Sequence, residues 1–151
     1  MENSNLDIVK VCLVKERSLY SDVKIKTPDD AIRVVARELS TCDREVFCVI
    51  NIKTTGEPIH LNVVSVGTLN ASLISSREVF KSSILCNAYG IIALHNHPSG
   101  DCTPSHDDIA ISQKLLRAGE LLDIPLLDHI IVAGGSNNYY SFNNHNIFTR
   151  S

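Results

Sequence analysis

The chain has 151 residues, of which 44% are hydrophobic and 21% are charged. That length suits one domain with its own core, and the apolar fraction excludes a disordered chain. The formal net charge of -3 disfavours nucleic-acid binding by this chain, because domains that hold a phosphate backbone are usually basic.

The cysteines and the N-terminus indicate where the protein works. The chain has five cysteines, an odd number, and no two of them form a CxxC pair. This pattern predicts free, buried thiols in a reducing cytosol rather than a disulfide framework. The N-terminus lacks a basic stretch followed by an apolar one, and no run reaches the roughly 18 apolar residues of a membrane span. We therefore expect a cytoplasmic protein with no membrane partner, and the oligomeric state stays open.

The first half of the chain predicts a strand, a helix and a hairpin. Residues 8–14 alternate between apolar and polar side chains, which predicts a first strand. Thr27–Asp30 predicts a helix start, with threonine as N-cap, proline at the first helical position and acids in the first turn. Residues 45–52 predict a buried strand, and residues 59–67 predict its hairpin partner after a glycine-containing turn.

The second half predicts helices and strands in alternation. Ser75 or Ser76 can cap a helix, and residues 89–97 predict another buried strand. A polar loop then leads to an amphipathic helix over residues 107–122. The expected core side of that helix is apolar: Ile109, Ile111, Leu115, Leu116 and Leu121. The last predicted strands are residues 126–134 and 139–142.

This order of elements, β-α-β-β-α-β-α-β-β, predicts a single α/β domain in which helices flank a mixed β-sheet. Hairpins combined with helices argue against a purely parallel, doubly wound fold. No long linker divides the chain. We therefore expect residues 1–26, an N-terminal extension with the first strand, to belong to the same domain as residues 27–151.

The residues most indicative of chemistry are two histidines at the end of a predicted strand. Side chains two apart, such as His95 and His97, project from the same face of a strand, roughly 6.6 Å apart along it. Asp108 lies in the first turn of the next predicted helix and can supply a third ligand if the loop folds back. Three protein ligands leave one tetrahedral position for water, which is typical of a catalytic zinc site.

The same residues match a known signature. His-x-His, seven residues, serine, two residues and aspartate is the pattern of the JAMM/MPN metalloproteases, and it runs here from His95 to Asp108 with Ser105 as the serine. The segments "HNHPSGDCTPSHDDI", "VVSVGTLNASLISSREVFKSSI" and "LLDHIIV" closely resemble the C-terminal domain of RadC-like proteins, the bacterial JAB branch of this superfamily. The resemblance runs from about Thr27 to Phe142. RadC-like proteins often carry an N-terminal helix-hairpin-helix region, and from its length we expect this chain to resemble a short, single-domain member without one.

The resemblance implies a JAB/MPN sandwich, similar to the fold of cytidine deaminases. It also implies a separate role for each residue of the site. His95, His97 and Asp108 are expected to bind Zn2+. Ser105 is expected to help hold the attacking water and stabilise the oxyanion. The bonds that the family hydrolyses are peptide or isopeptide bonds, so we expect a peptide or protein substrate and a zinc-dependent hydrolase, although the resemblance does not identify the substrate of the RadC branch.

The family also uses a glutamate from an early strand as general acid and base. We assign that role to Glu45, which opens the predicted strand 45–52. Glu78 is the rival, but it lies at a predicted helix N-terminus, where an acidic residue needs no catalytic explanation.

Other interpretations of these residues stay open. Ser105 and Asp108 also form a capping-box pattern, which is compatible with metal binding because a capped helix can present both residues to an ion. Cys102 is either a fourth, inhibitory ligand, a redox-sensitive thiol or an incidental loop residue, and we favour the last. His129, next to Asp128, is expected to support the site or the core rather than bind metal directly.

Two further functions compete with the hydrolase. The first is a partner-binding module that keeps the fold without catalysis, which the complete set of metal ligands disfavours. The second is a DNA-repair or other nucleic-acid-associated factor, which the family's name favours and the acidic net charge disfavours.

Overall fold

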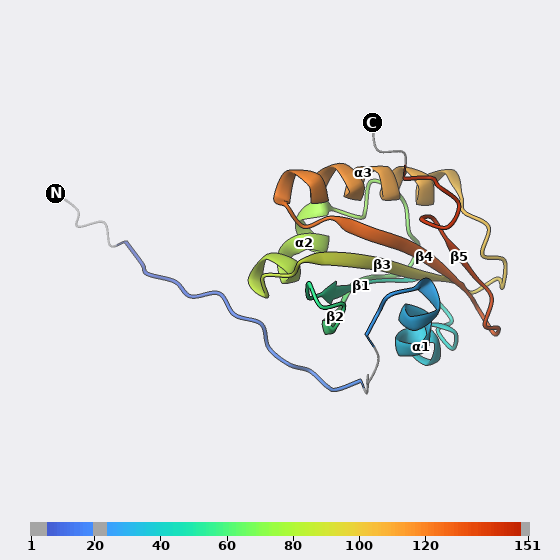
Figure 1. Cartoon of the computed structure of the whole chain (residues 1–151), viewed down its shortest axis with the longest axis horizontal. Helices are drawn as coiled ribbons and strands as arrows, with labels where there is room; N and C mark the ends of the chain where they lie inside the picture. The colour runs from blue at the N-terminus through green and yellow to red at the C-terminus, as the bar shows by residue number, and fades with distance from the viewer. Residues whose placement is uncertain (1–5, 20–23, 149–151) are drawn as a thin grey trace.

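The computed structural model describes residues 6–19 and 24–148. Within them a five-stranded sheet lies between three helices (Figure 1). The helices are α1 (Pro28–Leu39), α2 (Ser76–Leu85) and α3 (His106–Leu122). The strands are β1 (Val46–Ile52), β2 (Pro58–Val66), β3 (Gly90–His97), β4 (Leu126–Ala133) and β5 (Tyr139–Ser141). The prediction of a single α/β domain with helices around a mixed sheet is confirmed.

The sheet has the order β2-β1-β3-β4-β5, with β3 in its centre. β3 and β4 run parallel, whereas the other neighbouring pairs are antiparallel. β1 and β2 form the predicted hairpin, with Ile50 opposite Leu61. The helix α3 connects β3 to β4. Its N-terminus therefore lies near the C-terminal end of β3.

The two faces of the sheet carry separate cores. α1 covers one face, and α2 and α3 cover the other (Figure 1). Successive side chains of a strand point to opposite faces, so Leu94 packs in the cluster beneath α1 whereas Ala93 packs beneath α2 and α3. The odd-numbered side chains of β3 therefore face α3. This alternation directs His95 and His97 to one side of the sheet and Asn96 to the other.

The prediction of a first strand over residues 8–14 is wrong. Residues 6–19 form no strand, and the side chains of Ile8 and Val14 are 99% and 83% exposed. In Figure 1 this segment runs away from the sheet in an extended form. A strand needs a hydrogen-bonded neighbour, and an alternating pattern does not supply one.

The core side of α3 was predicted in part. Ile111 and Leu115 are fully buried, and Ile109 and Leu116 are partly buried. Leu121 was also expected on this side, but it is 85% exposed. It lies in the last turn of α3, where helical spacing alone does not show that the apolar stripe has passed beyond the sheet.

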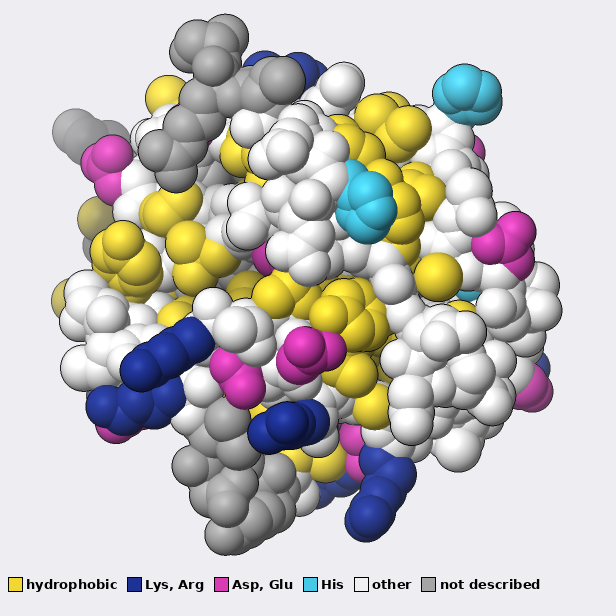
Figure 2. Space-filling model, turned by 45° about the vertical axis from the view of Figure 1, so that its right-hand side comes forward, with side chains coloured by type: hydrophobic (Ala, Val, Ile, Leu, Met, Phe, Trp, Pro, Cys, Tyr) yellow, Lys and Arg dark blue, Asp and Glu magenta, His cyan; other side chains and the backbone are white. Residues whose placement is uncertain are grey.

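The surface agrees with the modest net charge. On the face in Figure 2, lysine and arginine side chains are interspersed with aspartate and glutamate instead of forming one basic patch. All five cysteines carry free thiols; Cys48 is buried, whereas Cys12 is exposed because it lies in the extended N-terminal segment. Among the described residues, no helix combines the length and the apolar character needed to cross a bilayer.

Candidate metal centre

His95 and His97 end strand β3 on the face that α3 covers. His95 is completely buried, and the side chain of His97 is 13% exposed. The ring of Phe47, which lies opposite His95 on β1, stacks on the His95 ring with 5.9 Å between centroids. Aromatic packing thus limits where the His95 ring can turn. The site is therefore closed to solvent at His95 and open to solvent at His97.

Asp108 reaches the histidines from the first turn of α3. Ser105 is the N-cap of the helix, and its Oγ accepts a hydrogen bond of 3.1 Å from the Asp108 backbone N–H. The Asp108 Oδ2 in turn accepts one of 2.7 Å from the Ser105 N–H, which completes a capping box. This reciprocal pair fixes the start of the helix and the direction of the carboxylate. The capping and ligand interpretations are therefore compatible in one geometry.

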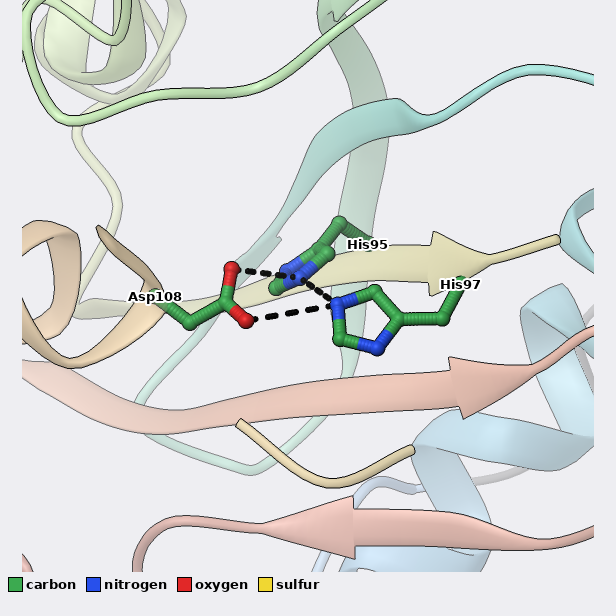
Figure 3. Close-up of side chains that lie close together, drawn as sticks. All are labelled: His95, His97 and Asp108. Atoms are coloured by element: carbon green, nitrogen blue, oxygen red, sulfur yellow. Dashed lines mark hydrogen bonds and ion pairs between the residues drawn. The ribbon is translucent and has the colours of Figure 1, made fainter. Parts of the chain in front are cut away.

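The three side chains converge at close range (Figure 3). His95 Nε2 lies 3.0 Å from Asp108 Oδ1, and His97 Nε2 lies 3.3 Å from Asp108 Oδ2. The two Nε2 atoms are 3.1 Å apart. Atoms that share a tetrahedral zinc ion at about 2.0–2.1 Å lie roughly 3.3 Å from one another. Two imidazole nitrogens and a carboxylate oxygen with these spacings fit a metal ion, and this group could hold one.

Charge is concentrated on the Asp108 carboxylate. Burial would raise the pKa of Asp108, but hydrogen bonds from His95 and His97 outweigh it and hold the pKa well below its ordinary range. The hydrogen bond to Asp108 raises the pKa of His97, against the opposing effect of burial. The carboxylate is therefore ionised at neutral pH. An anion buried next to two imidazoles is well suited to a divalent cation.

A short loop fixes the ring of His97. Its Nδ1 lies 2.7 Å from the backbone oxygen of Asp101 and donates a hydrogen bond to it, so in the neutral form of the ring Nε2 carries no proton and can bind an ion. Gly134, just after β4, lies against the start of this loop and donates from its N–H to the His97 oxygen at 2.9 Å. A Cβ at Gly134 would lie 2.9 Å from the Pro98 oxygen, so a larger residue would push the loop away.

Glu45 lies beside this group at the start of β1. The β1–β3 register pairs Phe47 with His95, so its continuation puts Glu45 opposite His97. The charge of Glu45 contributes to the raised pKa of His97. One oxygen of its carboxylate, Oε2, accepts a hydrogen bond of 2.8 Å from the Leu69 N–H. Among the described residues, the second oxygen has no hydrogen-bond partner, which leaves it available to another group.

Glu78 lies in a different environment. It is in the first turn of α2, is exposed, and pairs with Lys81 at 2.9 Å. The hydrogen bond from Lys81 lowers the pKa of the Glu78 carboxyl. Among the described residues, Glu45 lies beside the two histidines, whereas Glu78 does not. Cys102 in the loop is partly buried and does not belong to the metal-binding group.

Asn96 has a structural function that the sequence reasoning missed. Its side chain points to the face opposite the two histidines, where its Oδ1 accepts from the Val46 N–H at 2.7 Å. Its Nδ2 donates to the Arg44 oxygen at 2.9 Å. These two bonds bracket Glu45 and tie its backbone to β3. A polar residue between two ligands on a buried strand was the available signal, because buried polar groups are nearly always hydrogen-bonded.

The comparisons with known proteins agree with this geometry. A family model described as the RadC-like JAB domain matches residues 25–147. The chain belongs to the RadC-like JAB family. It is 42% identical over 129 residues to a "UPF0758 protein" of Desulfitobacterium hafniense, which covers 83% of this chain and 56% of the relative. It is 43% identical over 137 residues to a "UPF0758 protein" of Alkaliphilus metalliredigens, which covers 89% of this chain and 58% of the relative.

A third relative, a "UPF0758 protein" of Alkaliphilus oremlandii, is 40% identical over 143 residues, which cover 93% of this chain and 61% of the relative. This RadC-like JAB domain thus spans little more than half the length of the curated relatives it matches. The match confirms the predicted family and its JAB/MPN fold. The group of His95, His97 and Asp108 fits the metal site of a JAMM domain.

Proposed function

We propose that this RadC-like JAB domain is a zinc-dependent hydrolase of the JAMM type that cleaves a peptide or isopeptide bond. The single observation that supports the proposal most is the convergence of His95, His97 and Asp108, whose ligand atoms all lie within 4.8 Å of one another. These three residues would hold the ion and leave a tetrahedral position without a protein ligand. A zinc ion held there would act as a Lewis acid and lower the pKa of a bound water to about 7.

Glu45 is the proposed general base and acid. Its Oε1 is not used by the hydrogen bond to Leu69, so it can accept a proton from the attacking water. The same carboxyl would then deliver that proton to the leaving nitrogen of the amide. The hydrogen bond to Leu69 and the two bonds of Asn96 keep the carboxylate in one place, which a proton carrier requires.

Ser105 is the proposed donor to the oxyanion. Its Oγ accepts a hydrogen bond from the Asp108 N–H, and this leaves its own hydroxyl hydrogen free to donate. The residue is exposed at the N-terminus of α3, where the partial positive charge of the helix favours an anion. A hydroxyl fixed at this position would stabilise negative charge that develops on the carbonyl oxygen.

The proposal can be tested with a peptide library as substrate. The zinc-loaded protein is incubated with peptides from a digested bacterial proteome, and new N-termini are identified by mass spectrometry. We expect cleavage products that disappear when the protein is stripped of metal and in Glu45→Gln. Glu45→Gln should retain zinc, because Glu45 is not one of the ligands.

Glu78→Gln is the matched control, since it removes an equivalent charge that pairs with Lys81 outside the metal group. It should cleave like the wild type. An unreactive wild type with full zinc would instead favour a partner-binding module. Retention of DNA that weakens with rising salt would favour a nucleic-acid-associated factor. Loss of cleavage in Glu78→Gln but not in Glu45→Gln would reverse the assignment of the base.

A further inference from the structure

A chain of buried hydrogen bonds leads away from the metal centre. The Nδ1 of His95 lies 2.9 Å from the Nε2 of His129 on β4. The Nδ1 of His129 is hydrogen-bonded to the hydroxyl of Ser112 on α3. All three side chains have no exposed surface. These hydrogen bonds therefore join β3, β4 and α3 beneath the metal centre, where water does not compete for them.

The directions of these bonds depend on one another. A neutral imidazole carries one N–H, so His95 can present Nε2 to an ion only if its proton is on Nδ1. His129 must then accept at Nε2, which puts its own proton on Nδ1 and requires Ser112 Oγ to accept. In the opposite direction, His129 donates to His95, and the proton of His95 moves to Nε2. That arrangement blocks the ligand position.

Aromatic packing holds His129 in place for this task. Its ring stacks on Phe142 with centroids 4.8 Å apart and planes inclined by 11°. The edge of Phe47 meets it from another side, at 5.7 Å. The ring is fully buried among aromatic side chains, which disfavours a second proton on it. His129 thus stays neutral, with one donor and one acceptor.

We propose that His129 and Ser112 are positioning residues that hold His95 in the Nδ1–H tautomer, with Nε2 directed at the ion. The proposal rests on the zinc site of the proposed function. Histidine ligands usually donate their second N–H to a carboxylate, a carbonyl or water, and loss of that acceptor lowers metal affinity about 10- to 100-fold. Here the acceptor is a neutral ring, whose own Nδ1–H in turn donates to the hydroxyl of Ser112.

Zinc affinity, measured by competition with a chelator, tests the proposal. His129→Phe keeps an aromatic ring against Phe142 but removes the acceptor, and we expect zinc to bind about 10- to 100-fold more weakly. His129→Gln restores an acceptor and should bind more tightly than His129→Phe. Ser112→Ala should weaken binding by a smaller factor, because His129 itself remains. Wild-type affinity in His129→Phe would overturn the proposal.

The matched control is His60→Phe. His60 is a partly buried histidine on β2 that hydrogen-bonds Asn51 at 3.0 Å, so its loss also removes a polar contact but leaves the metal group intact. It should bind zinc like the wild type. Equal weakening in His60→Phe and His129→Phe would show a general loss of stability and overturn the positioning function.

A second measurement needs no variant. Long-range 1H–15N NMR spectra of the zinc-loaded wild type report which ring nitrogen of each histidine carries the proton. We expect Nδ1–H for both His95 and His129, and Nε2–H on His129 would overturn the assignment. Failure of the proposed function looks different: zinc bound with the expected tautomers but no cleavage of any peptide would contradict the hydrolase and still support the tautomers. A wild type that takes up no zinc would overturn both.

Discussion

Two helices of this protein begin with the same local device and differ in what that device does. α1 begins with a capping box of Thr27 and Asp30, and α3 begins with one of Ser105 and Asp108. In both, the aspartate carboxylate accepts from the N-cap backbone N–H, at 3.0 Å in α1 and 2.7 Å in α3. In both, the N-cap oxygen accepts from the aspartate N–H, at 3.3 Å and 3.1 Å.

The difference lies in what the rest of the fold brings to each carboxylate. Within the described residues, the Asp30 oxygens have only local hydrogen-bond partners, namely Lys26 and Thr27. Asp108 is 3% exposed and also meets two histidines from the end of β3. A sequence of the form Ser/Thr-x-x-Asp therefore predicts a helix start in both places. Only the strand that ends nearby brings one of the two caps into a group that could hold a metal ion.

The largest expected effect separates the two aspartates by metal content. Asp108→Asn should lose more zinc affinity than the 10- to 100-fold typical of residues behind the ligands, because it removes a charged ligand itself. Asp30→Asn should bind zinc like the wild type. Elemental analysis after dialysis measures both. If Asp108→Asn still binds one zinc ion per protein, the capping box of α3 only starts its helix, as the capping box of α1 does.

The two N-cap residues should differ in catalysis. Once a cleaved peptide is known, Ser105→Ala should lower its turnover about 100- to 1000-fold, the cost of removing one oxyanion donor. Thr27→Ala should leave turnover unchanged, since Thr27 is hydrogen-bonded to Asp30 at the other capping box. Steady-state rates on zinc-loaded proteins measure the effect. Equal turnover in the two variants would confine Ser105 to capping.

Stability, in contrast, should not distinguish the N-caps. In the metal-free protein, Thr27→Ala and Ser105→Ala should each lower the free energy of unfolding by about 1 kcal/mol, the usual cost of losing an N-cap side chain. Urea denaturation in the presence of a chelator measures both. If Ser105→Ala loses several times more unfolding free energy than Thr27→Ala, the capping box of α3 stabilises more than its own helix.

The smallest expected effect is a pH dependence of the metal-free protein. The pKa of His97 is raised above 6.5, mainly by its hydrogen bond to Asp108, so protonated His97 stabilises the fold below pH 6.5. This stability is lost as the pH rises through the raised pKa. His129, with a lowered pKa, is neutral in the folded protein, and above about pH 7.5 it is almost fully neutral in the unfolded chain too, so it adds no slope there.

Thermal unfolding between about pH 7.5 and 9 with a chelator present should therefore show a decline in the wild type. The decline should be weaker in Asp108→Asn, which lacks the charge that holds the proton on His97. Asp30→Asn should decline like the wild type. A wild-type curve that rises over this range would contradict the proposed interaction of His97 with Asp108.

Much of the fold could be predicted from periodicity and caps. The hairpin of β1 and β2 and the start of α1 at Thr27 follow from local sequence, and both are present. Residues 8–14 show the limit of the approach, because alternation describes a segment and not its neighbour. Leu121 shows the same limit for helices: spacing gives the direction of a side chain but not whether a sheet lies beneath it.

The metal group could be predicted because its residues are close in sequence and their spacing is specific. The environment of Glu45 and the partners of His95 could not, since they depend on contacts between distant segments. Asn96 lies 50 residues from Val46, and His129 lies 34 from His95. Strand register brings such residues together, and register follows from the whole sheet rather than from any one segment.

The side-chain amide of Asn96 has a consequence for motion. It is bonded on both sides of Glu45, to the Arg44 oxygen and the Val46 N–H, and it is part of the same strand as His95 and His97. When thermal fluctuations shift β1 against its neighbour, the segment that carries the proposed acid stays hydrogen-bonded to the strand that carries two of the proposed ligands. The distance between Glu45 and the two histidines should then vary less than other distances across the sheet.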